Sequence, residues 1–215
     1  MLVACWSAKG GSGTTVVASS LAVLLARRDP LGSLLVDVAG DVPTALGVAD
    51  PDGPGLAGWL AAGPGVPADG LHRLEQPVEH GLALLPRGGG PLDPSRADAL
   101  AALLAADARP VVVDCGTLQE EVGRTLAAGA TRSVLVTRPC FLALRRALAA
   151  PLRPSEVVLL AEPGRALGPA DLEECLGVPV TAEVAVDPAV ARAVDAGLLA
   201  TRLPRRLSRD LARAA

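Results

Sequence analysis

Aromatic residues are almost absent from this sequence, which has one phenylalanine, two tryptophans and no tyrosine among 215 residues. Hydrophobic residues nevertheless make up 50% of the chain, so its core is expected to consist of alanine, valine and leucine. No apolar run approaches the roughly 20 residues that a membrane-spanning helix needs. These features predict a cytoplasmic protein that folds as a single domain over residues 1–215, with no signal peptide.

Paired cysteines and a surplus of basic residues are also missing. Cys5, Cys115, Cys140 and Cys175 are widely spaced, which favours reduced structural thiols over a zinc site. The formal net charge is −3, whereas proteins that bind nucleic acid in general carry a basic surplus. Nucleic acid is therefore not an expected partner.

Lysine occurs only once, as Lys9, because the other nineteen of the twenty basic residues are arginine. It opens the glycine-rich stretch 9–15, which lies between an apolar run and a helical pattern. Glycines let several backbone N–H groups point at one anion, and the start of a helix adds partial positive charge. The stretch therefore predicts a phosphate-binding loop that needs a compact ammonium group at residue 9. A tight turn without any ligand is the alternative.

Short apolar runs alternate with longer helical patterns along the whole chain. Strands are expected at Leu2–Trp6, Ser33–Val38, Leu82–Leu85, Pro110–Asp114, Ser133–Thr137, Glu156–Leu160 and Val178–Val184. Helices are expected at Thr15–Arg27, Gly55–Ala62, Pro94–Ala106, Gln119–Ala128, Phe141–Ala149, Pro169–Leu176, Pro188–Ala196 and Pro204–Ala214. Two segments rich in glycine and proline, 50–69 and 86–94, are expected to be surface loops.

This alternation predicts an α/β fold of three layers, in which helices cover both faces of a mainly parallel sheet. In such sheets ligands bind outside the carboxyl ends of the strands. Three features should therefore meet at one edge: the loop that contains Lys9, Asp37 after the second strand, and Asp114 after the fourth. Each aspartate could instead simply cap the turn that follows its strand.

The segment 9–15, KGGSGTT, closely resembles the deviant Walker A motif of the MinD/ParA-type P-loop ATPases, K-G-G-x-G-K-[ST]. Segment 34–41 is similar to the second-strand aspartate motif of that family, and segment 111–116 to its Walker B motif. Segment 186–194 is similar to the D-P-x-V-x-x-A stretch that lies near the adenine site. Thr14 departs from the family pattern because it replaces the loop lysine, an alteration similar to those in the atypical TadZ/CpaE branch.

The resemblance implies ATP and Mg²⁺ as cofactors. The residues expected to bind the nucleotide are Lys9, Gly10, Gly11, Ser12, Gly13, Thr14 and Thr15. Their backbone N–H groups can hold phosphate without any side chain. The hydroxyl of Thr15 and a water held by Asp114 would complete the Mg²⁺ shell. Glu162 stands where relatives carry an asparagine, so we expect an altered base pocket. Its carboxylate could still accept the adenine amino group, but it cannot supply the paired donor and acceptor of an amide.

The resemblance also implies catalytic roles for Lys9, Asp37 and Asp41. Lys9 would reach across an ATP-sandwiched homodimer to the nucleotide of the partner. Asp37 would order the magnesium waters or the attacking water. The family usually has a second aspartate at the position of Ala39, and Asp41 would replace it only in part.

Hydrolysis is expected to be slow or absent, because losing the loop lysine removes a transition-state contact worth about 3–4 kcal/mol. Binding through the backbone would suffer less. The sequence therefore predicts an ATP-binding protein that acts as a nucleotide-gated dimer and positions a pilus or secretion apparatus, the division site or a chromosome. The alternative is a non-catalytic scaffold that keeps the fold and the dimer surface but no longer binds ATP.

The C-terminal segment Leu203–Ala215 spaces its leucines four residues apart, with arginines between them. Such a helix usually packs its leucines on the domain and leaves its arginines in water. The alternative is an amphipathic helix that binds a membrane surface and holds the protein at the membrane or the cell pole. Arg138 is expected to form an ion pair, with an approach to phosphate as the alternative. His72 and His80 are expected to be ordinary surface residues.

Overall fold

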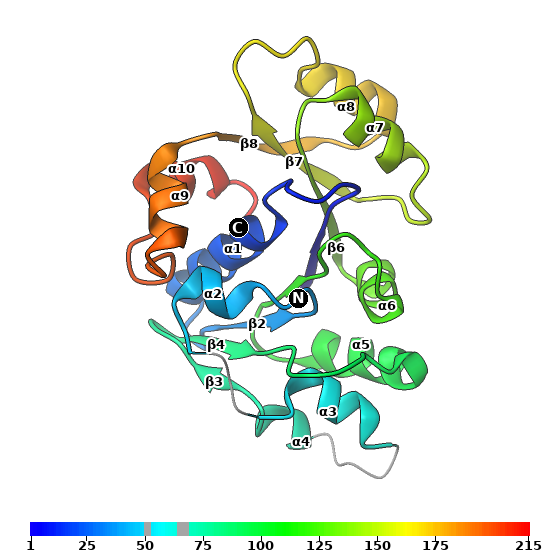
Figure 1. Ribbon diagram of the computed structural model, residues 1–215, viewed down its shortest axis with the longest axis vertical. Helices are drawn as coiled ribbons and strands as arrows, with labels where there is room; N and C mark the ends of the chain where they lie inside the picture. Colours follow the sequence, from blue (N-terminus) through cyan, green and yellow to red (C-terminus); the bar gives the residue numbers. More distant parts are fainter. Residues whose placement is uncertain (50–52, 64–68) are drawn as a thin grey trace.

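The computed structural model describes residues 1–49, 53–63 and 69–215. Its centre is an eight-stranded sheet in the order β3-β4-β2-β5-β1-β6-β7-β8, with helices on both faces (Figure 1). The strands are β1 (Leu2–Trp6), β2 (Ser33–Asp37), β3 (Gln76–Pro77), β4 (Leu82–Leu85), β5 (Val111–Asp114), β6 (Arg132–Thr137), β7 (Glu156–Ala161) and β8 (Val180–Ala185). Only the pairing of β3 with β4 is antiparallel among the described strands. The predicted three-layer α/β class is confirmed.

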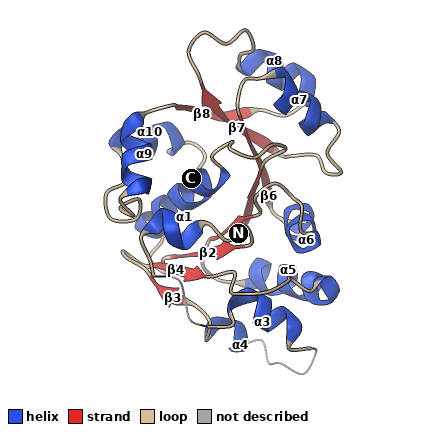
Figure 2. Ribbon diagram, in the orientation of Figure 1, coloured by secondary structure: helices blue, strands red, loops and turns tan. Residues whose placement is uncertain are grey.

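The helices form two groups, one on each face of the sheet (Figure 2). The first group consists of α1 (Thr14–Arg28), α2 (Val42–Leu46), α9 (Pro188–Asp195) and α10 (Arg205–Leu211). The second consists of α3 (Gly55–Ala61), α4 (Asp69–His72), α5 (Ala97–Ala106), α6 (Glu121–Gly129), α7 (Phe141–Leu148) and α8 (Pro169–Leu176). A short 3₁₀ helix, η1 (Pro94–Arg96), leads into α5.

Strand β1 shows why apolar runs form the centre of this sheet. Every residue of β1 is at most 1% exposed. Because side chains alternate along a strand, Leu2, Ala4 and Trp6 join the core on one face, while Val3 and Cys5 join the core on the other. Burial raises the pKa of the Cys5 thiol; Cys5 and Cys115 are buried, whereas Cys140 is half-buried and Cys175 is exposed.

Three elements were not predicted from the sequence: α2, α4 and β3. Helix α2 has five residues and α4 has four, so neither is long enough to show a helical repeat. Strand β3 has two residues, one of them Pro77, and exists only through its pairing with β4. The expected loop at 86–94 is confirmed up to η1. The expected loop at 50–69 contains α3 and the start of α4, and its residues 50–52 and 64–68 lie outside the described residues.

The C-terminal helix packs on the domain. Leu207 and Leu211 of α10 are 2% and 0% exposed and belong to the core that covers α1 and β8. Arg28 Nη1 donates to the carbonyl of Ala215 at 2.9 Å, and Arg132 Nη2 donates to that of Ala214 at 2.7 Å. The leucines of 203–215 therefore pack on the domain, which is the first of the two arrangements expected from the sequence. None of the described helices could cross a membrane.

Candidate functional site

The glycine-rich loop connects the end of β1 to the start of α1. Gly11 and Gly13 have φ angles of 75° and 83°, which side chains with a Cβ rarely adopt. Ser12 Oγ donates to the carbonyl of Lys9 at 2.7 Å and fixes the curve from inside. A Cβ on Gly10 or Gly11 would meet no atom within 4 Å, so these glycines face open space.

The N–H groups of this loop are free to bind an anion. Within the part of the chain that the structure describes, no hydrogen bond is donated by the backbone N–H groups of residues 10–15. They lead into α1, which is 15 residues long and has no acidic residue in its first turn. Unpaired donors at the start of a long helix are the arrangement that holds phosphate.

Asp114 and Thr15 provide a place for a divalent cation beside the loop. The Asp114 side chain is 0% exposed; its Oδ1 accepts from the N–H of Gly116 at 3.1 Å. Its Oδ2 is buried without a hydrogen-bond partner among the described residues. Burial raises the pKa of Asp114, and the neighbouring Thr15 side chain lowers it but does not satisfy Oδ2. An unpaired carboxylate oxygen beside a hydroxyl fits Mg²⁺ or one of its waters.

Asp37 lies next to Asp114, as the strand ends predicted. The two residues are partners in the parallel register of β2 and β5. Both oxygens of Asp37 are in use: Oδ1 accepts from the N–H of Gly40 at 2.6 Å, and Oδ2 from that of Val42 at 3.3 Å. Burial raises the pKa of Asp37 to about 7, with a further rise from the Asp114 charge. Asp37 thus caps the turn that follows β2.

Asp41 lines a cavity of about 300 Å³ at the same edge. The cavity lies between the loop after β2 and the loop after β5, and its other lining residues include Arg87, Gly116 and Glu120. Ser7 at the start of the phosphate loop donates through its N–H to the carbonyl of Gly116 at 2.8 Å. The three loops after β1, β2 and β5 therefore form one continuous surface. Arg87 was not singled out in the sequence.

A second, apolar cavity of about 320 Å³ borders the phosphate loop on its other side. It is lined by Gly13, Val16, Leu160 and Val190, among other residues. A Cβ on Gly13 would lie 2.8 Å from Leu160 Cδ2, so the leucine would have to shift, and the φ of 83° at Gly13 itself favours glycine. Helix α9, which carries the D-P-x-V-x-x-A match, forms another wall. The cavity has the apolar character that suits a flat ring such as a nucleobase.

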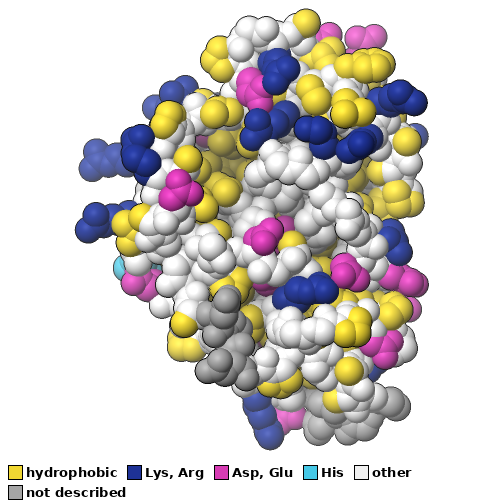
Figure 3. All heavy atoms as spheres, in the orientation of Figure 1, with side chains coloured by type: hydrophobic (Ala, Val, Ile, Leu, Met, Phe, Trp, Pro, Cys, Tyr) yellow, Lys and Arg dark blue, Asp and Glu magenta, His cyan; other side chains and the backbone are white. Residues whose placement is uncertain are grey.

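Arg138 and Glu162 form the expected ion pair at the rim of this cavity. Arg138 Nη1 lies 2.7 Å from Glu162 Oε1, and Arg165 also pairs with Glu162. Hydrogen bonds from Arg165 and Arg138 lower the pKa of Glu162. The carboxylate is therefore already occupied by two arginines and is not a free acceptor for a base. Figure 3 shows basic side chains gathered over this upper part of the molecule, around β7, α7 and α8.

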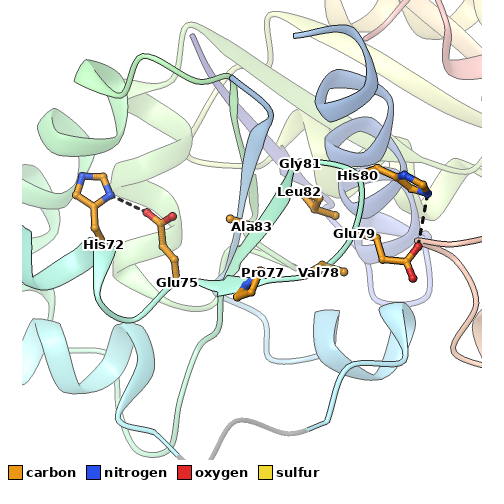
Figure 4. Close-up of a pocket in the computed structure, with 9 residues that line it drawn as sticks. All are labelled: His72, Glu75, Pro77, Val78, Glu79, His80, Gly81, Leu82 and Ala83. Atoms are coloured by element: carbon orange, nitrogen blue, oxygen red, sulfur yellow. Dashed lines mark hydrogen bonds and ion pairs between the residues drawn. The ribbon is translucent and has the colours of Figure 1, made fainter. Parts of the chain in front are cut away.

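A third cavity, of about 510 Å³, lies at the β3–β4 edge, away from the phosphate loop (Figure 4). His72 Nδ1 lies 2.8 Å from Glu75 Oε1, and Asp107 completes a group that could hold a metal. Arg109, however, binds both Glu75 and Asp107 at 2.8 Å. The side chains of His72 and His80 are 62% and 60% exposed. They are surface residues, as expected, although His72 does have acidic neighbours.

Solved structures identify the fold. The chain is similar to a ParA family ATPase from Chlorobium tepidum TLS, with a TM-score of 0.81 and 21% identity over 98% of this chain and 95% of that one. It is similar to the septum site-determining protein MinD from Pyrococcus horikoshii OT3 complexed with Mg-ADP, with a TM-score of 0.81 and 19% identity over 99% and 93% of the two chains. It is also similar to MinD in a MinC:MinD complex from Aquifex aeolicus, with a TM-score of 0.78 and 18% identity over 98% and 91%.

The other two comparisons gave no relatives, because no family model matches the sequence and no curated protein is similar to it. The structural similarity extends over nearly the whole chain. At these sequence identities the similarity establishes the fold. The chemistry of the site has to be argued from its own residues. The chain has the fold of the MinD/ParA ATPases.

Proposed function

We propose that this protein binds ATP with Mg²⁺ in the loop 9–15 and acts as a nucleotide-gated homodimer with slow or absent hydrolysis. The observation that carries the proposal is the unpaired set of loop N–H groups beside the orphaned Oδ2 of Asp114. The buried Oδ2 is costly without a partner, and the loop N–H groups are accessible to an anion because Gly10 and Gly11 are exposed. The MinD relative from Pyrococcus horikoshii, crystallised with Mg-ADP, has the same fold.

Each residue of the site has a defined task in this proposal. The N–H groups of Gly10 to Thr15 hold the phosphates, and the apolar cavity beside Gly13 and Leu160 receives the base. The Thr15 hydroxyl and Asp114 hold Mg²⁺, which would neutralise the charge of the β- and γ-phosphates when bound. Lys9 extends from the half-exposed start of the loop toward a second subunit.

Slow hydrolysis follows from two features of the site. Thr14 is neutral and stands at the position of the loop lysine. Its side chain therefore cannot stabilise the negative charge that develops on the phosphate in the transition state. Both oxygens of Asp37 already accept backbone hydrogen bonds, which leaves them poorly placed to orient an attacking water. The protein would then respond to bound ATP more than consume it.

The proposed role is to position other machinery in the cell. The Aquifex aeolicus relative was crystallised as a MinC:MinD cell division complex. A protein of this fold that changes its oligomeric state with ATP can hold a partner at a chosen place, such as the division site, a chromosome or, following the TadZ/CpaE resemblance, a pilus or secretion apparatus. The competing function is a scaffold with the same fold that does not bind ATP.

Calorimetry with ATP separates these two functions. We expect wild-type protein to bind ATP in the presence of Mg²⁺, and Thr15→Ala to bind it about tenfold more weakly, because one charge-assisted contact to the cation is lost. Thr44→Ala, an exposed threonine on α2, is the matched control and should bind like wild type. Absence of binding at millimolar ATP with Mg²⁺ would leave only the scaffold.

The homodimer is tested through the single lysine. The Lys9 side chain makes no ion pair or hydrogen bond among the residues that the structure describes, so its removal should not disturb the monomer. We expect ATP and Mg²⁺ to shift wild-type protein from monomer to dimer in light scattering after size exclusion, and Lys9→Ala to stay monomeric while still binding ATP. Lys9→Arg, which keeps the charge, should dimerise in part. A Lys9→Ala protein that dimerises as well as wild type would rule out the cross-subunit role.

A further inference from the structure

Arg87 joins the two loops that flank the carboxylates of the site. It follows β4, which lies beside β2 in the sheet (Figure 1). Its Nη1 donates to the carbonyl of Val38, directly after β2, at 2.5 Å. Its Nη2 donates to Glu120 Oε1, in the loop after β5, at 3.1 Å. A single side chain thus connects the loop of Asp37 to the loop of Asp114.

The backbone of Arg87 is held in place by α3. The N–H of Leu56 donates to the carbonyl of Pro86 at 2.9 Å, and that of Ala57 to the carbonyl of Arg87 at 2.8 Å. Gly88 has a φ of 72°, and a Cβ there would lie 2.2 Å from the carbonyl oxygen of Pro54. The segment therefore packs too closely to move freely, so the Arg87 side chain extends from a fixed base.

The loop after β2 approaches Arg87 closely at Gly40, where the backbone conformation favours glycine. Gly40 has a φ of 100°, and a Cβ there would lie 3.2 Å from Arg87 Cδ. Only 20% of the Arg87 side chain is exposed. Two of its five N–H donors are used in the bridge, and the guanidinium is the one basic group among the described residues that line the 300 Å³ cavity.

The third phosphate of a nucleotide would extend toward this cavity. A diphosphate needs only the N–H groups of the loop 9–15. Thr15 and Asp114 would hold a cation that neutralises the terminal phosphates, so a third phosphate would extend to the Asp114 side of the loop. Asp37 is the neighbour of Asp114 across the strands, and the cavity walls are the loops that follow these two residues. Only ATP, through its third phosphate, would therefore reach the loops that Arg87 connects.

We propose that Arg87 is a positioning residue by which the site distinguishes ATP from ADP. Its bridge from Val38 to Glu120 keeps the loops after β2 and β5 in the one arrangement that receives a third phosphate. The proposal rests on the proposed function, since it requires a nucleotide in the loop 9–15. Arginine suits this task because its planar fork holds two acceptors at once, which lysine cannot do.

The test is the ratio of the ATP and ADP dissociation constants, measured by calorimetry with Mg²⁺. We expect wild-type protein to prefer ATP, and Arg87→Ala to bind ATP about tenfold more weakly while its ADP affinity stays unchanged. Arg87→Lys should restore only part of the preference. Arg96→Ala is the matched control: Arg96 also donates to a backbone carbonyl, that of Trp59, at 2.5 Å, but lines none of the cavity. It should lower stability and leave the ratio unchanged.

The outcomes separate this proposal from the function on which it rests. If wild-type protein binds neither nucleotide, the proposed function fails and the role of Arg87 fails with it. If wild-type protein binds ATP but shows no preference over ADP, or if Arg87→Ala changes both affinities equally, the nucleotide site stands and Arg87 has only a structural role.

Discussion

Changing Thr14 to lysine is expected to raise the rate of ATP hydrolysis by about two to three orders of magnitude. Thr14 is the first residue of α1, and its side chain is 7% exposed. A lysine there would bury its methylene stem along the loop and bring its ammonium group to the phosphates. This ammonium group would stabilise the negative charge that develops on the phosphate in the transition state, which the neutral side chain of Thr14 cannot do. Steady-state release of phosphate at saturating ATP and Mg²⁺ measures the gain.

Thr14→Val is the matched control for this change. Valine has nearly the same shape as threonine and carries no charge, so the rate should stay at the wild-type level. If Thr14→Lys binds ATP and still does not hydrolyse it faster than Thr14→Val, the missing lysine is not the reason for slow turnover. The engaged oxygens of Asp37 would then be the cause to examine.

The sheet could be predicted from the sequence because its strands are buried on both faces. Runs such as Leu2–Trp6 and Val111–Asp114 are apolar throughout, and helical patterns separate them. The rule that ligands bind at strand ends also placed Asp37 beside Asp114, and their register confirms it. Strands and helices with a regular hydrophobic pattern, and side chains at the ends of strands, could therefore be predicted without the structure.

The contacts of the site could not be predicted in this way. Arg87 reaches Val38 and Glu120, which lie 49 and 33 residues away in the chain, and its local sequence of glycines and prolines suggested only a loop. The sequence predicted an ion pair for Arg138 but not its partner, because the pairing of Arg138 with Glu162 depends on the meeting of segments after β6 and β7. Such contacts result from tertiary packing, and no spacing along the chain encodes them.

Asp37 is expected to make the folded state less stable as the pH rises from about 4 to about 7. Burial raises its pKa to about 7, and the Asp114 charge adds to this, while the N–H of Gly40 opposes it. In this window the folded state keeps a proton that the unfolded state has released. Each pH unit therefore lowers the free energy of unfolding by up to about 1.4 kcal/mol, or about 4 kcal/mol over the window. Above the folded pKa both states are ionised, and this slope ends.

Asp37→Asn should remove that part of the pH dependence. The amide cannot ionise, but it offers only one acceptor to the N–H groups of Gly40 and Val42, so the variant should be less stable than wild type at pH 4. As the pH rises, the free energy of unfolding falls for wild type but not for the variant. By pH 8 the difference in free energy of unfolding between wild type and Asp37→Asn should have changed by about 4 kcal/mol in favour of the variant. Urea unfolding at a series of pH values measures this shift. Asp41→Asn removes an exposed carboxylate from the same loop and controls for the loss of one charge. An Asp37→Asn profile parallel to that of wild type would show that Asp37 is already ionised in the folded protein at pH 4.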